Sequence, residues 1–239
     1  MTRRFAPGCA LMLYKPRAVE RLAGLLGESI GAGQPWMTCC RKDPQFAEET
    51  ELVNVCPGCD KRFRLNYPLT STISLWEILA RSEAFPFPDY RGRTMAILDA
   101  CPTRDQPRIH EAVRALLGRM NITVSEPRST KTKGICCGDS MWGEIPTPEV
   151  MARMKMRAAE MPAPNVVVYC VSCALAVSIG GKTPRYMIDL LFGEETRPRI
   201  LDLDVWHAEL QAYIDGGGAP GLLPGDLLPP YSPLNKNQG

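Results

Sequence analysis

The pattern of apolar and polar positions predicts strands and helices that alternate along most of the chain. Thr94–Ala100 is mostly apolar and predicts a buried strand, and the β-branched run Asn165–Tyr169 predicts a central strand. Between them, the Thr-Pro-Glu sequence at 147–149 supplies a capping hydroxyl, a proline and a carboxylate. These residues predict a helix that runs to about residue 160. Alternating strands and helices indicate an α/β fold with a mostly parallel sheet.

A similar helix is marked in each half of the chain. Proline starts and glycine ends an amphipathic stretch at 16–27 and again at 107–118. The other predicted elements are short strands and helical stretches at Glu51–Val55, Leu75–Leu79, Asn121–Val124 and Met187–Leu191. The two halves thus carry comparable elements in the same order.

The cysteines repeat in these two halves as C, CC and CxxC. The first set is Cys9, Cys39, Cys40, Cys56 and Cys59, and the second set is Cys101, Cys136, Cys137, Cys170 and Cys173. Such a repeat indicates an internal duplication. CC and CxxC are separated by residues 41–55 in the first half and by residues 138–169 in the second. The first half therefore lacks a counterpart of the helix predicted from residue 147.

The composition of the segments between and after the repeats suggests the domain boundaries. A proline-punctuated stretch at 85–90 separates the halves, and the chain beyond residue 216 is rich in glycine, proline and leucine. We expect a first, shortened repeat at 1–88, a second at 89–210 and a tail at 211–239. The leucines of the tail favour draping over a surface rather than dangling.

Charge and composition narrow the classes of partner. The chain has 239 residues, 45% of them hydrophobic, and 28 basic against 26 acidic side chains give a net charge of +2. This balance gives no broad polyanion-binding signal, so we expect no nucleic-acid partner. His110 and His207 are the two histidines of the chain, which leaves little supply for histidine-based metal sites or catalytic triads.

The amino-terminal sequence resembles a signal peptide only superficially. Pro7 and Gly8 interrupt its apolar run, and charged residues follow soon after. The chain has no apolar stretch long enough to form a membrane-spanning helix, so we expect no direct membrane insertion. These features favour the reducing cytoplasm, where many cysteines argue for metal or redox chemistry rather than for structural disulfides.

Three kinds of chemistry could use ten cysteines. Disulfides would require an oxidising compartment, and adjacent residues such as Cys39 and Cys40 rarely bond to each other. A zinc site could combine the two CxxC pairs, but it would leave six cysteines without a role. Iron–sulfur clusters use thiolates, and a CxxC at the start of a helix places two sulfurs within reach of one cluster. Five cysteines per set is one more than a cubane cluster requires.

The two sets resemble the tandem CCG domains of the cysteine-rich heterodisulfide reductase family. Cys101, Cys136-Cys137-Gly138 and Cys170-x-x-Cys173 look like one copy, and the first set looks like a second. The resemblance covers about residues 5–192. It implies an α/β fold of two pseudo-symmetric repeats with small parallel sheets, and two noncubane 4Fe-4S clusters near the interface between them. All ten cysteines would be ligands, five to each cluster, with one thiolate of each set bridging irons.

The same resemblance implies an activity and a partner. Members of this family reduce a mixed disulfide of two thiol coenzymes, and electrons arrive from a ferredoxin-like subunit. We therefore expect an oxidoreductase subunit that acts on a disulfide or related sulfur substrate by one-electron steps. The alternatives are a non-catalytic electron-transfer subunit of a larger complex and a cluster-based redox sensor.

The first copy departs from the family pattern, because Arg41 stands where CCG has its glycine. Glycine is expected to let the backbone approach the cluster, whereas arginine brings a side chain and a positive charge. The first set could therefore hold a noncubane or a cubane cluster. Asp99 and Tyr169 lie beside ligands and are expected to form structural hydrogen bonds, and His110 is expected at the surface.

Overall fold

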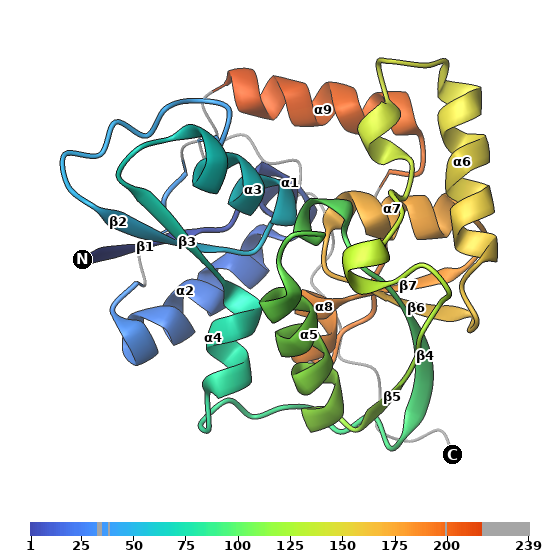
Figure 1. Cartoon of the computed structure of the whole chain (residues 1–239), viewed down its shortest axis with the longest axis horizontal. Helices are drawn as coiled ribbons and strands as arrows, with labels where there is room; N and C mark the ends of the chain where they lie inside the picture. The colour runs from blue at the N-terminus through green and yellow to red at the C-terminus, as the bar shows by residue number, and fades with distance from the viewer. Residues whose placement is uncertain (33–34, 38, 199, 217–239) are drawn as a thin grey trace.

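The computed structural model describes residues 1–32, 35–37, 39–198 and 200–216, and within them two parallel β-sheets carry helices on their faces (Figure 1). The first sheet has the order β1-β2-β3. Its strands are β1 (Thr2–Ala6), β2 (Thr50–Asn54) and β3 (Thr70–Ser74). Its helices are α1 (Cys9–Tyr14), α2 (Pro16–Ile30), α3 (Pro57–Asn66) and α4 (Leu75–Arg81).

The second sheet has the order β5-β4-β6-β7, again with parallel neighbours. Its strands are β4 (Arg93–Leu98), β5 (Ile122–Ser125), β6 (Asn165–Val168) and β7 (Thr183–Tyr186). The helices of this half are α5 (Pro107–Arg119), α6 (Thr147–Ala159), α7 (Val171–Ile179), α8 (Met187–Leu191) and α9 (Leu203–Asp215). Three single 3₁₀ turns complete it: η1 (Cys101–Thr103), η2 (Lys131–Lys133) and η3 (Asp139–Met141).

The predicted α/β class is confirmed, with two small parallel sheets flanked by helices in a Rossmann-like arrangement. In both halves a strand leads to the first cysteine, a second strand leads to CxxC, and a third strand leads to a short helix. The second half adds β5 and α6 to this order. The origin of the two halves as a pseudo-symmetric repeat, with boundaries at 88 and 210, stays a prediction.

Two predicted helix ends are wrong for identifiable reasons. The helix from Pro16 does not stop at Gly27, because its apolar face continues and Gly31 ends it in the left-handed conformation at φ 69°. Thr147 does not cap α6, since it is already helical and its hydroxyl donates to Asp204 instead.

Several elements have no counterpart in the sequence-based expectations, among them helix α1 and the three 3₁₀ turns. Strands β1, β3 and β7 are short and carry several polar or exposed residues, so their apolar periodicity is weak. Helix α9 crosses the expected boundary at residue 210. The predicted draping of the leucines at 222–228 lies outside the described residues.

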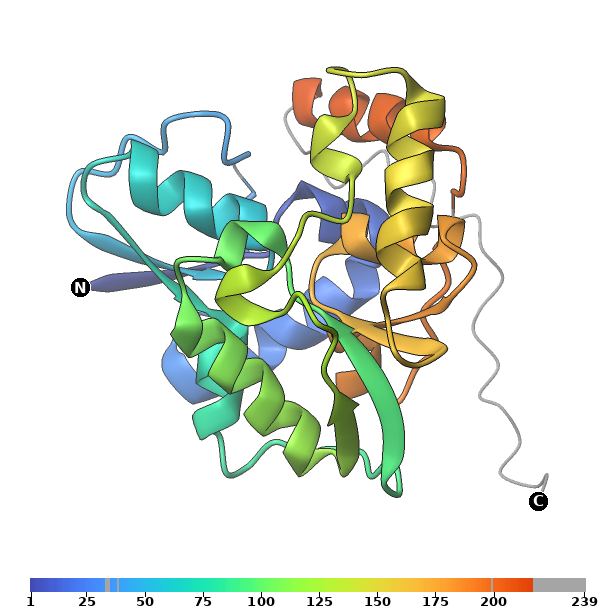
Figure 2. The same ribbon diagram turned by 45° about the vertical axis from the view of Figure 1, so that its right-hand side comes forward.

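One hydrophobic core extends through both halves. At their interface α1 packs against α7, α3 packs against η1, and α4 packs against α5 (Figure 2 shows α5 from the side). Gln106, just after η1, donates to Asp60 of α3 at 3.0 Å, and both side chains are buried. The cysteine-bearing segments of one half therefore pack against those of the other. None of the described helices has the length and apolarity needed to cross a membrane.

Candidate metal sites at the two cysteine sets

Parallel strands deliver four of the cysteines to one kind of position, the junction between a strand end and a helix start. Cys9 begins α1 after β1, and Cys101 begins η1 after β4. Cys56 and Cys170 are the N-cap residues of α3 and α7, which follow β2 and β6. The carboxyl ends of parallel strands are where open α/β sheets usually place their chemistry, and helix N-termini favour negative charge.

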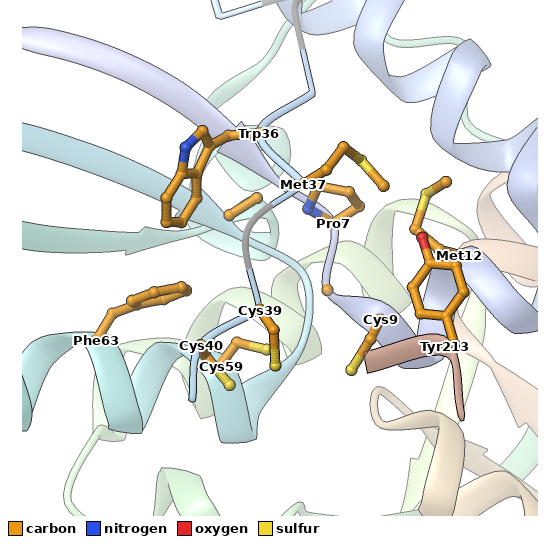
Figure 3. A pocket seen from close by; sticks show the side chains of 12 residues that line it. Pro7, Cys9, Met12, Trp36, Met37, Cys39, Cys40, Cys59, Phe63 and Tyr213 are labelled. Atoms are coloured by element: carbon orange, nitrogen blue, oxygen red, sulfur yellow. The ribbon is translucent and has the colours of Figure 1, made fainter. Parts of the chain in front are cut away.

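The structure brings the five sulfurs of the first set together. Neighbouring thiols shift each other's pKa along the series Cys9, Cys39, Cys40, Cys59 and Cys56, as closely spaced groups do. Four of these thiols line a small pocket, whose free volume of about 10 Å³ is roughly that needed by one water molecule (Figure 3). Its other side-chain walls include Met12, Trp36, Met37, Phe63 and Tyr213.

The second set repeats the same chain of contacts. Neighbouring thiols shift each other's pKa along the series Cys101, Cys136, Cys137, Cys173 and Cys170. All ten cysteines are free thiols in the structure, as expected for a metal site and not for a disulfide framework. The sequence-predicted residues thus fall into two groups, five in each.

One thiol in each set is the preferred site of negative charge. Hydrogen bonds from Cys40 and Cys9 lower the pKa of Cys39 to about 2. Hydrogen bonds from Cys101 and Cys137 lower the pKa of Cys136 in the same way. Backbone N–H groups add to this, since Arg41 N lies 3.5 Å from Cys39 Sγ and Gly138 N lies 3.3 Å from Cys136 Sγ.

Several of the other thiols resist ionisation, whereas hydrogen bonding from Cys59 lowers the pKa of Cys56 to about 7. Hydrogen bonding to Cys39, then burial, raises the pKa of Cys9, and hydrogen bonding to Cys136, then burial, raises the pKa of Cys101. Hydrogen bonding to Cys137 and burial likewise raise the pKa of Cys173. Five thiolates in contact would repel one another, so a set can be fully ionised only around positive charge. Metal ions supply that charge and replace the protons.

The donor sets fit a multi-iron group. No three His, Cys, Asp or Glu side chains in the described part of the chain converge as the ligands of a single metal ion do. A 4Fe-4S cluster carries its irons at separate corners, so its thiolates need not meet at one point. Gly8 supports close packing at the first set. At its φ of 83°, an added Cβ would lie 3.0 Å from Cys56 Cβ and 3.3 Å from Cys59 Sγ.

A buried polar network ties the strand ends of the second set together. Tyr169, beside Cys170, donates to Asp99 Oδ1 at 3.0 Å, and its hydroxyl lies 3.0 Å from Thr103 Oγ1. Arg114 donates to both carboxylate oxygens of Asp99, at 3.1 and 2.9 Å. Burial alone would raise the pKa of Asp99, but these hydrogen bonds and the charge of Arg114 lower it to about 2. The expected structural role of Asp99 and Tyr169 agrees with this geometry.

His110 is buried and not at the surface as expected, with 1% of its area exposed. Its Nε2 lies 2.9 Å from Thr103 Oγ1, so it extends the network around Asp99. The residue lies on the inner face of the amphipathic helix α5, next to Ile109 and Val113. His110 is spaced three residues before Val113, so it falls on the same apolar face of the helix. This spacing is the sequence signal that could have revealed its burial.

The glycine of CCG packs closely against α6, and its expected approach to a cluster stays a prediction. Gly138 has φ 111°, and an added Cβ would lie 3.1 Å from Met154 Cγ and 3.3 Å from Val150 O, both on α6. The close approach is therefore to α6. Residues 41–49, all of them described, contain no helix, so Arg41 meets no such constraint. This accounts for arginine at that position.

The two sets both lie at the interface between the halves. The helix that begins with Cys9 packs against α7, which contains Cys173, while α3 with Cys59 packs against η1 with Cys101. Tyr186 is 1% exposed, and its pKa is raised by burial and then by the charges of Cys170 and Cys56, one from each set.

No protein-family model and no curated protein sequence matches the chain. Among solved structures, the chain is similar to the crystal structure of glutamate racemase isoform RacE1 from Bacillus anthracis. The sequence identity is 14%, the match covers 89% of this chain and 82% of the racemase chain, and the TM-score is 0.35. A similarity at this level carries no information about activity.

Proposed function

We propose that the chain is an iron–sulfur redox protein of the CCG-domain heterodisulfide reductase type, which reduces a disulfide or a related sulfur substrate. The observation that supports this most strongly is that the fold gathers five free thiols in each set, close enough to shift one another's pKa in the same order in both sets. A tetrahedral zinc site or a cubane cluster uses four cysteines. Two five-thiol sets are the donor supply that two noncubane 4Fe-4S clusters would use.

Reduction of one disulfide to two thiols takes two electrons and two protons. Because the bound clusters would supply electrons one at a time, the reaction would need two electron-transfer steps. The chain's own residues hold the thiolates at strand ends and exclude water from the buried Cys59, Cys137 and Cys173. The N–H groups of Arg41 and Gly138 donate to the sulfurs of Cys39 and Cys136 and stabilise their negative charge.

Partial exposure of the first set favours catalysis over the alternative of a non-catalytic electron-transfer subunit. Cys9, Cys39 and Cys40 are only half-buried, so a small sulfur compound could reach the set from solvent. A relay requires no such access. The sequence has no CxxCxxCxxxCP motif, so the electrons would come from another chain, which we propose to be a ferredoxin-like subunit.

Anaerobic purification with iron, sulfide and zinc analysis and EPR tests the cluster assignment. We expect roughly eight irons per chain with matching acid-labile sulfide, and EPR signals that report whether each cluster is cubane or noncubane. About one zinc per chain without sulfide would contradict the proposal.

Incubation of the reduced holoprotein with small disulfides separates an enzyme from a relay or a sensor. We expect free thiols to appear in proportion to the electrons supplied. A holoprotein that exchanges electrons with a donor protein but releases no thiol would instead be a relay. Cluster changes without turnover would indicate a sensor.

A further inference from the structure

Helix α9 contacts the loops that follow both CC pairs. His207 Nε2 lies 3.1 Å from Asp139 Oδ1, and its ring stacks on Trp142 with 4.1 Å between centroids and 7° between planes. Four residues later, Gln211 accepts a hydrogen bond from Arg41 at 2.9 Å. Positions 207 and 211 share one face of the helix. The same face therefore reaches the loop after Cys136-Cys137 and the loop after Cys39-Cys40.

The amino-terminal end of α9 is anchored on the second half. Asp204 Oδ1 accepts hydrogen bonds from Trp142 Nε1 at 2.7 Å and from Thr147 Oγ1 at 2.8 Å. Asp202 caps the helix by accepting from the N–H groups of Asp204 and Val205 at 3.0 Å. Both views place α9 beside α6 along the top of the molecule (Figures 1 and 2).

The other end of α9 lies at the first set. Tyr213 lines the pocket that contains Cys9, Cys39, Cys40 and Cys59 (Figure 3). The helix packs against α1, which begins with Cys9, and Trp206 and Ile214 are buried. Figure 1 shows α9 running from the side of α6 to the side of α3, across both halves.

The second set has a helix of its own that the first set lacks. Helix α6 follows Cys136-Cys137 after the turn η3 and packs against Gly138, whereas no helix occurs in residues 41–49. The side chain of Arg41 extends to α9 instead. Helix α9, from the carboxyl-terminal part of the chain, thus packs at the first set, whose segment between CC and CxxC is short.

We propose that α9 completes the first cysteine set in place of the missing helix, and that Asp204 and His207 are positioning residues that hold it there. They act through α9, since neither belongs to the first half. The identity of the group that the first set binds rests on the proposed function. The protection of the first set by α9 is independent of that function. Release of α9 should therefore open the first set more than the second, which keeps α6 and the network around Asp99.

Alkylation of the full-length, reduced, metal-free chain tests this directly. Iodoacetamide labelling, followed by peptide mass spectrometry, gives a rate for each cysteine. In the double variant Asp204→Ala with His207→Ala we expect about tenfold faster labelling of Cys9 and Cys39, and less than about twofold change at Cys101 and Cys170. A matched variant, Glu111→Ala with Lys155→Ala, alters exposed residues of α5 and α6 and should leave all rates unchanged.

Unchanged rates at Cys9 and Cys39, or equal acceleration at all cysteines of a folded variant, would overturn the proposal. If the double variant does not fold, Gln211→Ala serves instead and should accelerate labelling of Cys39 relative to Cys101. Replacing His207 by glutamine instead of alanine keeps a hydrogen-bond donor for Asp139. The variant Asp204→Ala with His207→Gln should therefore label Cys9 and Cys39 more slowly than the double alanine variant. Iron release from the holoprotein to a chelator gives a second readout, in which about half of the iron should leave faster. If the protein binds no iron, the proposed function fails while the labelling result still stands.

Discussion

The two cysteine sets have the same thiols in the same order of contact, but different structures support them. Around the second set, buried polar groups centred on Asp99 join the ends of β4 and β6, and α6 backs the CC loop. Around the first set the corresponding positions are Pro7 and Val55, and close packing at Gly8 takes the place of the hydrogen bonds. Helix α9 lies where a local helix is missing.

This difference indicates that the arrangement of the thiols depends on strand ends and helix starts more than on the surrounding chain. Each CxxC comes at the end of a strand, where a helix begins. The backbone therefore fixes both cysteines of the motif at a helix start. The CC pairs lie in loops and need support from elsewhere, which the two halves obtain from different helices. Changes at the strand ends should therefore have larger effects than changes in the CC loops.

Removing one ligand from each set tests whether the sets are independent. Cys56→Ser and Cys170→Ser should each remove about four of about eight irons, because each residue belongs to one set. Iron analysis and EPR of the two variants should give complementary signals. Loss of all iron in both variants would show that the sets load as one unit.

Asp99→Asn should be the most destabilising change outside the cysteines. It leaves Arg114 without one of its two acidic partners and weakens hydrogen bonds from Thr130, Tyr169 and the Lys131 N–H. Removing one partner of a buried pair typically costs about 3 kcal/mol or more, and we expect about 3 because Glu126 still pairs with Arg114. Urea unfolding measures it, with Asp215→Asn on the exposed end of α9 as the control. A cost below about 1 kcal/mol would contradict the role of the network.

Gly8→Ala should damage the first set specifically. The φ of 83° and the short contacts with Cys56 and Cys59 predict a cost of about 1–3 kcal/mol and loss of iron from that set. Gly31→Ala is the matched control, since its φ is 69° and an added Cβ would meet no atom within 4 Å. The control should lose stability and keep its iron. Equal iron loss in both variants would show that backbone strain alone is responsible.

Gly138→Ala should act through α6. The added Cβ would press on Met154 and Val150, so we expect a loss of about 1–3 kcal/mol in unfolding free energy and faster labelling of Cys136. Gly143→Ala, at φ 83° with no atom within 4 Å, separates strain from contact. If Gly138→Ala instead removed iron without affecting stability, the glycine would be needed at the cluster.

Arg41→Gly restores the CCG sequence at the first set and should have the smallest effect. The variant loses the hydrogen bond to Gln211 and gains backbone freedom, which together cost about 0.5–1 kcal/mol. We expect no gain in iron content, because residues 41–49 contain no counterpart of α6 that would require glycine at this position. A marked gain in iron would mean that the arginine itself limits cluster binding.

Much of the fold could be predicted because its signals are local. The β-branched run at 165–168 and the proline that starts α5 determine strand and helix within a few residues. The grouping of the cysteines into two sets could be predicted for the same reason, because local sequence signals predict most of the strands and helices that carry them. Strands β1 and β7 could not be predicted, because their polar residues are held by pairing with β2 and β6.

Local sequence was enough to establish the α/β alternation, the two cysteine sets and the absence of a helix after the first CC pair. The support of each set, in contrast, comes from the packing of distant segments. Tyr169 meets Asp99 from 70 residues away, and Arg41 meets Gln211 from 170 residues away. Helix α9 and the buried His110 owe their places to such packing. Apolar periodicity indicates that a helix has a buried face, but the neighbour that covers this face depends on how distant segments pack together.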